Sequence, residues 1–151
     1  MEQPILCKHF DELTNRELYE ILKARSAVFV VEQNCPYQDI DGLDVFSHHL
    51  FISREDQSVA ACLRVFRKPD EPGIAQIGRV VTTQRGSGLG RRILHAGVEK
   101  AFRDYHAEGI YLEAQVYAIG YYQKEGFEVV SEPFLEDHIP HVQMRLKAPE
   151  H

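Results

Sequence analysis

The alternation of apolar and polar positions divides the chain into segments with helical and strand-like spacing. Apolar residues three and four apart follow Thr14 and predict a helix of about four turns that reaches Phe29. Thr14 and Glu17 have the spacing of a capping box, which places the start of this helix. Helical spacing recurs over 89–102, and a short third helix is predicted over 118–125.

Shorter segments rich in β-branched and aromatic residues predict strands. They cover residues 49–53, 59–66, 74–82, 110–116, 126–130 and 142–146. Between the first helix and the first strand, residues 32–44 carry four acids and no base, and predict an ordered loop or a short helical turn. The chain thus begins its sheet with three strands, which are followed by a loop, a helix, a strand, a short helix and further strands. This order indicates an α/β (α+β) domain with a mixed sheet.

Composition narrows the class of protein. A chain of 151 residues with 44% apolar content predicts one domain over 1–151 with its own core. No run approaches the roughly 18 apolar residues of a membrane span, and the N-terminus lacks the pattern of a signal peptide, so we expect a cytoplasmic protein without a membrane partner. The net charge of −6 and the lack of basic clusters argue against nucleic acid as a partner.

Cysteine and histidine spacing predicts neither disulfides nor a metal site. Cys7, Cys35 and Cys62 are odd in number and form no C-x-x-C pair, so we expect reduced, mostly buried thiols. His138 and His141 have a three-residue spacing that could suit a metal, but Pro140 interrupts any regular helix face between them.

The strongest local feature is a glycine-rich loop that joins the 74–82 strand to the 89–102 helix. Gly86, Gly88 and Gly90 let the backbone turn tightly, and the start of a helix favours an anion such as a pyrophosphate. A dinucleotide fingerprint would need glycine in place of Arg91, and a Walker A loop would need G-K-[ST] where this chain has Gly90-Arg91-Arg92. The loop therefore fits neither motif.

The segment Arg85-x-x-Gly88-x-Gly90 resembles the coenzyme A signature [QR]-x-x-G-x-[GA] of the GNAT N-acetyltransferase superfamily. A tight turn before a helix would explain this loop alone. However, Tyr121-Tyr122-x-x-x-Gly126-Phe127 resembles the aromatic segment that the superfamily carries one strand and one helix later. Longer strings resemble the ElaA-like branch and extend the likeness over nearly the whole chain. They lie within 28–38, 41–44, 77–81, 112–115 and 136–141.

The resemblance implies a GNAT fold, with a mixed and mostly antiparallel sheet of about six or seven strands flanked by about four helices. It implies acetyl-CoA as cosubstrate, no metal, and a small-molecule or peptide amine as acceptor. The pyrophosphate would be held by the backbone of Gly86, Ser87, Gly88, Leu89, Gly90 and Arg91, with added charge from Arg85, Arg91 and Arg92. The main chain of Val80 and Val81 would pair with the pantetheine arm and polarise the thioester carbonyl, while their side chains would suit a core.

The resemblance also implies roles for a few side chains. Tyr122 would be the general acid for the departing thiolate, although it could equally pack like Tyr121. The general base stays open among residues that could also be structural. The candidates are Glu32, His48, His49 and Glu113. Glu113 shares a strand face with Tyr111 and Gln115, and His141 is a further candidate contact to the acceptor.

The predicted activity is acetyl transfer to a primary amine by direct attack in a ternary complex. The alternative is a coenzyme-binding sensor or scaffold without transfer activity. A homodimer is a family-level expectation that agrees with the exposed edge strands of a short sheet. Acids gather in 32–44 and 125–137, and if both segments flank the acceptor channel, their field would attract cationic amines.

Overall fold

The computed structural model describes residues 3–34, 38–84, 86–136 and 138–149. Eight strands form one mixed sheet in the order β1-β2-β3-β4-β5-β8-β6, and β7 also pairs with β8. The strands are β1 (Leu6–His9), β2 (His48–Ser53), β3 (Val59–Lys68), β4 (Glu71–Thr82), β5 (Gly109–Gln115), β6 (Glu128–Val129), β7 (Phe134–Glu136) and β8 (Ile139–Lys147). The α-helices are α1 (Asn15–Arg25), α2 (Leu89–Arg103) and α3 (Ile119–Gln123). A π-helix, η2 (Ser26–Glu32), continues α1, and three 3-10 turns are η1 (Phe10–Glu12), η3 (Asp44–Phe46) and η4 (Val116–Ala118).

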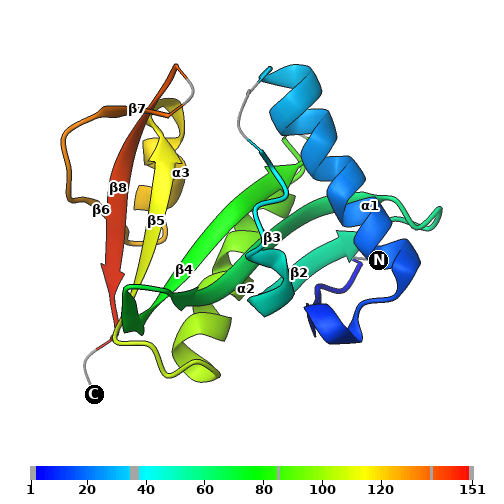
Figure 1. Ribbon diagram of the computed structural model, residues 1–151, viewed down its shortest axis with the longest axis horizontal. Helices are drawn as coiled ribbons and strands as arrows, with labels where there is room; N and C mark the ends of the chain where they lie inside the picture. Colours follow the sequence, from blue (N-terminus) through cyan, green and yellow to red (C-terminus); the bar gives the residue numbers. More distant parts are fainter. Residues whose placement is uncertain (1–2, 35–37, 85, 137, 150–151) are drawn as a thin grey trace.

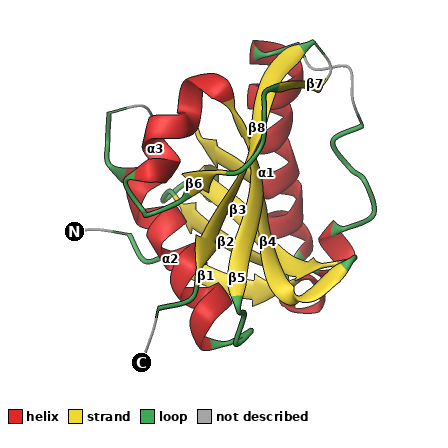
Figure 2. Cartoon of the chain, turned by 90° about the vertical axis from the view of Figure 1, so that its left-hand side faces the viewer, coloured by secondary structure: helices red, strands yellow, loops and turns green. Residues whose placement is uncertain are grey.

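Strand alternation divides the core into two clusters on opposite faces of the sheet. Leu50 and Ile52 point to the face that α2 covers, whereas Phe51 points to the face that α1 covers. The two helices accordingly lie on opposite sides of the sheet (Figure 2). Burial of apolar side chains on both faces explains why the central strands tolerate few polar residues.

The first helix begins as the sequence predicts. The Thr14 hydroxyl accepts a hydrogen bond from the Glu17 amide at 3.1 Å, and the Glu17 carboxylate accepts one from the Thr14 amide at 2.9 Å. The predicted helix does extend past Phe29, but it changes type, because the α-helical bonds end at Arg25 and the π-helix η2 continues to Glu32. Apolar spacing does not show this change, since α- and π-helical turns differ by one residue in hydrogen-bond register.

The sheet has more strands than predicted, while the α-helices number three instead of about four. The short strands β1 and β7 lie outside the predicted set, and β8 begins at Ile139 instead of 142. β1 pairs antiparallel with β2, and β7 with β8. Such short strands form because a longer neighbour offers unpaired backbone groups. For β1 that neighbour lies about 40 residues away, whereas for β7 it is the strand that follows directly.

The parallel pair β4 and β5 separates soon after it forms. Its pairing covers only Ile74–Gln76 against Gly109–Tyr111. β3 stays paired with β4 as far as Thr82, and β8 stays paired with β5 as far as Gln115. The sheet therefore splits, and β4 and β5 diverge towards the top of Figure 1. Residues 77–82 of β4 have a strand partner on the β3 side alone.

This second part of β4 also carries a β-bulge. Val81 pairs with Cys62 and Gly78 pairs with Arg64, so Arg79 and Val80 stand opposite the single residue between those partners. Arg79 has a φ of +51°, in the left-handed region that side chains other than glycine rarely adopt. The bulge lies where β4 has lost its pairing with β5.

The cysteines differ in burial. Cys62 is fully buried in the α1-side cluster, and burial raises the pKa of its thiol to about 12. Cys7 is exposed, contrary to the expectation of mostly buried thiols, because it lies on the edge strand β1. Cys35 lies outside the described residues. In the described part of the chain, no helix is both long and apolar enough to span a membrane.

Candidate active site

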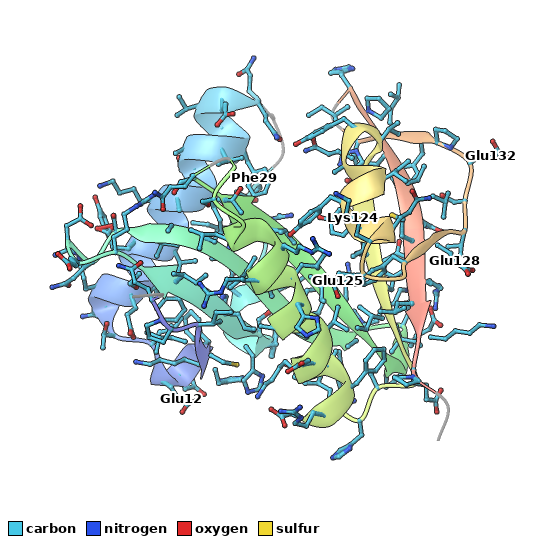
Figure 3. All side chains as sticks on the ribbon, turned by 180° about the vertical axis from the view of Figure 1, so that it is seen from behind. Glu12, Phe29, Lys124, Glu125, Glu128 and Glu132 are labelled. Atoms are coloured by element: carbon cyan, nitrogen blue, oxygen red, sulfur yellow. The ribbon has the colours of Figure 1, made fainter. Side chains whose placement is uncertain are left out.

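A cleft of about 1100 Å³ occupies the space between the separated strands. One wall is formed by η2 and the second half of β4, and the other by β5, η4, α3, β7 and β8. In the view from behind, Phe29 marks the η2 side and Lys124 the α3 side (Figure 3). The walls meet again where Gln115 Nε2 donates a hydrogen bond of 2.9 Å to Gln33 Oε1, so residues 82 positions apart close one side of the cleft.

The glycine loop has the conformation that its composition predicts. Gly86 and Gly88 have φ values of +75° and +78°, and a Cβ at either position would meet nothing within 4 Å. Glycine is needed there for its backbone conformation, and the space above the loop is open. Gly90 is needed for a different reason, because a Cβ there would lie 3.0 Å from Thr82 Cγ2 at the edge of the cleft.

The start of α2 presents backbone donors to that open space. Its first helical bond runs from the Arg92 amide to the Gly88 carbonyl at 3.2 Å, so the amides of Gly90 and Arg91 precede the regular ladder. These donors and the helix dipole fit a pyrophosphate. The loop therefore fits the cradle that the glycine pattern predicts.

The other predicted residues of this cradle lie in the same turn. Leu89 begins α2, and the exposed Ser87 donates its hydroxyl hydrogen to the Gln84 carbonyl at 2.8 Å. Arg91 is exposed, whereas Arg92 donates to the main-chain oxygen of Gln3 at 3.0 Å and so ties the N-terminal segment to α2. Arg85 lies outside the described residues.

Val80 and Val81 both line the cleft on the β4 edge that has no partner strand. Their side chains pack as expected for core residues, with Val81 buried in the α1-side cluster and Val80 packed against the α2-side cluster. The edge leaves backbone groups available to an extended ligand, in the manner of an added strand.

The two neighbouring tyrosines of α3 differ in their surroundings. Tyr121 donates its hydroxyl hydrogen to the Gly90 carbonyl at 2.5 Å, which ties α3 to the glycine loop. Tyr122 lines the cleft, packs edge-on against Tyr121 and Phe127, and makes no hydrogen bond through its hydroxyl to any described residue. Burial, helped by Tyr117, raises the pKa of Tyr122 well above its usual value. Its phenol therefore stays protonated at neutral pH.

Two of the base candidates line the cleft. Glu32 lies at the end of η2, and Glu113 lies on the opposite wall. The Glu113 carboxylate accepts a hydrogen bond of 2.7 Å from the Tyr111 hydroxyl and makes no ion pair with the described residues. A carboxylate that faces the cleft without a cation can accept a proton or hold a cationic group.

The two histidine candidates do not line the cleft. His49 is 1% exposed, and its Nε2 lies 2.9 Å from the carbonyl oxygen of Asp44. Burial lowers the pKa of His49, so it is a buried, hydrogen-bonded core residue. His48 bonds through Nδ1 to the Tyr105 hydroxyl at 2.7 Å, also away from the cleft. Their positions argue against both as the base, because the β2 strand lies two strands from the β4 edge.

His141 does line the cleft, as the sequence predicts for an acceptor contact. It is largely buried on β8, bonds through Nδ1 to the Ile139 carbonyl at 2.8 Å, and lies 3.5 Å through Nε2 from the Glu136 carboxylate. Within the described ranges, no three His, Cys, Asp or Glu side chains are grouped so as to hold a metal ion.

The acids of the 32–44 segment are largely paired, contrary to the expectation of an open negative field. Asp39, Asp41 and Asp44 contact Arg25, Arg64 and Arg79. Arg25 is 1% exposed and donates through Nη1 to Asp44 at 2.7 Å. Burial alone would raise the pKa of Asp44, but the bonds and charges of Arg25 and Arg64 lower it below its usual value.

Arg64 holds the outer part of this network. It donates to both oxygens of Asp41, at 2.8 and 2.7 Å, and to Asp44 at 3.1 Å. Burial opposes ionisation of Asp41, yet the two bonds from Arg64 lower its pKa to about 2. The sequence interpretation missed Arg64 and Arg79 as site residues. Their signal was a single base inside an otherwise apolar strand, which marks a buried charge that needs a partner.

Comparison with known proteins agrees with this geometry. Residues 30–148 match the sequence profile of the acetyltransferase (GNAT) domain. The chain belongs to the GNAT acetyltransferase family. It is 39% identical over 140 residues to the protein ElaA of Escherichia coli, which spans 90% of this chain and 91% of ElaA. The family uses acetyl-CoA, and the ElaA-like resemblance inferred from the motifs is confirmed.

Solved structures give the same result for the GNAT fold. The crystal structure of Escherichia coli ElaA matches with a TM-score of 0.89 at 35% identity, over 97% of this chain and 100% of that one. An acyl-CoA N-acyltransferase from Pseudomonas aeruginosa matches with a TM-score of 0.87 at 41% identity, over 95% of this chain and 99% of that one. The predicted fold class and the prediction of a GNAT-family enzyme are confirmed.

Proposed function

We propose that this protein transfers the acetyl group of acetyl-CoA to a primary amine, by direct attack of the amine in a ternary complex. The observation that carries the proposal is the shared cleft, in which Gly90 at the start of α2, the unpaired edge of β4 and Tyr122 line one space. Bound acetyl-CoA would supply an activated thioester.

The chain's own contribution is mainly orientation. The backbone amides of residues 86–91 hold the diphosphate, and the main chain at Val80 and Val81 aligns the pantetheine arm along β4. A backbone N–H directed at the thioester carbonyl would stabilise the charge that develops on its oxygen. Holding the amine beside this carbonyl removes much of the entropic cost of a reaction between two molecules.

The reaction also requires two proton transfers. Tyr122 supplies the proton from its hydroxyl to the leaving thiolate, which leaves as the thiol of free coenzyme A. Glu32 or Glu113 accepts the proton that the attacking ammonium must lose, directly or through water. Both carboxylates reach the cleft from opposite walls, which supports them over the histidine candidates.

The test is release of free coenzyme A over a panel of polyamines, aminoglycosides, amino acids and peptides. With an accepted amine, Tyr122→Phe should lower kcat about 100-fold, the scale of a lost general acid, and leave the affinity for acetyl-CoA by calorimetry within about twofold. Tyr19→Phe, on an exposed position of α1 outside the cleft, is the matched control and should change neither quantity.

The outcomes separate the enzyme from the alternative. An unchanged rate in Tyr122→Phe removes the proposed acid. No release of coenzyme A with any amine, despite tight acetyl-CoA binding, favours the sensor or scaffold. No binding of acetyl-CoA at all contradicts both.

A further inference from the structure

The bulge residue of β4 has an unusual backbone for its side chain. Arg79 is the one residue other than glycine that has a positive φ inside a strand of the described chain, whereas Asn34, Gln57, His106 and His138 lie outside the helices and strands. A left-handed conformation disfavours any side chain with a Cβ, and such a residue persists where its surroundings hold it. The contacts of the Arg79 side chain therefore indicate which residues hold the bulge.

The Arg79 guanidinium lies against the Asp39 segment. Its Nε is 2.8 Å from Asp39 Oδ1, and its Nη2 donates to the Asp39 carbonyl at 3.1 Å. Nη2 also lies 3.3 Å from Asp41 Oδ2. The side chain therefore reaches across from β4 to the segment that precedes η3 and makes several contacts there.

Asp39 is itself held in place from the other side. Arg25 donates through Nε to Asp39 Oδ2 at 3.1 Å and through Nη2 to the Asp39 carbonyl at 2.9 Å. Because Arg25 belongs to α1 and is buried, it gives Asp39 a fixed position relative to the sheet. The contact between Arg79 and Asp39 thus ties the bulge to α1 through a buried charge.

The bulge directly precedes the backbone that the proposed function uses. Val80 and Val81 follow Arg79 on the unpaired edge of β4, and the orientation of their peptide groups depends on the dihedral angles of Arg79. We propose that Arg79, anchored by Asp39, is a positioning residue that holds this backbone in its reactive orientation. The inference rests on the proposed function for its kinetic consequence.

Direct contact of Arg79 with a substrate is the competing explanation, because Arg79 also lines the cleft. The two explanations differ in the role of Asp39. If Asp39 anchors Arg79, loss of either residue releases the same bulge, and the double variant should be no worse than the single ones. If Arg79 binds a substrate directly, Arg79→Gly should raise the KM for that substrate, whereas Asp39→Ala should not.

The experiment compares wild type, Arg79→Gly, Asp39→Ala and the double variant. Glycine tolerates the positive φ, so Arg79→Gly removes the anchor without adding backbone strain. Each single variant should lose about tenfold in kcat with KM for acetyl-CoA within about threefold, and the double variant should match them. Gln57→Gly relieves a positive φ of +72° in an exposed turn and should leave the kinetics unchanged.

A second readout does not need activity. In the ¹⁵N-labelled protein, the amide signals of Val80 and Val81 should broaden or split in Arg79→Gly and stay unchanged in Gln57→Gly. Unchanged Val80 and Val81 signals, additive kinetic losses, or a rise in KM with Arg79→Gly alone would each overturn the proposal. If the wild-type protein releases no coenzyme A with any amine, the proposed function is contradicted. The amide signals of Val80 and Val81 would still decide the role of Arg79.

Discussion

Two groups of acidic residues, one beside the cleft and one on its wall, differ in what surrounds them. Asp39 lies just before η3 and Asp44 begins it, and the buried Arg25 contacts both of them. Glu113 lies on the opposite wall, where the described chain offers it a tyrosine hydroxyl and no cation. The first group is therefore structural, while the second leaves negative charge available to an acceptor.

The difference shows that the number of acidic residues in a segment does not predict the electrostatic field around it. The segment 32–44 contains four acids and no base, yet the bases that neutralise three of them come from α1, β3 and β4. Within 125–137, Glu125 bonds to His95 at 3.2 Å, whereas Glu128 and Glu132 are exposed. Any electrostatic attraction for cationic amines would therefore come from the carboxylates of the cleft wall more than from the 39–44 segment.

The largest effect that would test this comparison is the loss of a buried partner. Asp44→Ala leaves the guanidinium of Arg25 buried with one carboxylate fewer, so we expect the free energy of unfolding to fall by about 3–5 kcal/mol. Urea denaturation measures this change. Glu113→Gln is the matched control and should alter stability by less than about 0.5 kcal/mol. Equal effects of the two substitutions would erase the distinction between the groups.

A smaller effect should appear in the acid stability of the fold. The pKa of Asp41 is lowered to about 2 by Arg64, below the value of about 4 for an unfolded chain. A lowered folded-state pKa means that Asp41 stabilises the fold above pH 4, and this contribution disappears as the pH falls through 4 towards 2. Asp41→Asn should therefore lower Tm at neutral pH and flatten the loss of Tm between pH 4 and 2. An identical slope in both proteins would contradict this assignment.

The smallest effect concerns attraction of the acceptor. If Glu32 is the general base, removal of the Glu113 charge should lower kcat/KM for a cationic amine about threefold, as expected for an exposed charge, and reduce the dependence of kcat/KM on salt. A neutral amine of similar size should show neither change. Glu128→Gln, on β6 outside the cleft, is the control for net charge. If Glu128→Gln has the same effect as Glu113→Gln, the attraction comes from the net charge and not from the cleft wall.

Local features account for most of what the sequence predicted correctly. The capping box at Thr14 and the left-handed glycines Gly86 and Gly88 involve residues within a few positions of one another. The long strands and α2 follow from apolar periodicity over one segment. Tyr122 was identified through its spacing from Gly126 and Phe127 on one short stretch of chain, and the structure places it in the cleft.

The features that escaped prediction depend on contacts that periodicity within one segment does not show. β1 pairs with a strand about 40 residues away, whereas β7 pairs with β8 directly after it, and both are too short to show an alternating pattern. From the sequence, His49 is a candidate base, and only its burial beside Asp44 argues against that role.

By itself, the sequence determined the family, the conformation of the glycine loop and the order of the main elements, because these depend on motifs and on contacts within single segments. Only the tertiary structure decided that β4 and β5 separate and that Arg79, in the bulge of β4, contacts Asp39. It also decided that arginines from other elements neutralise the acids of the 39–44 segment. These outcomes depend on distances between charges and strands that chain folding brings together, and the interaction of two charges depends on that distance and on burial, not on separation along the chain.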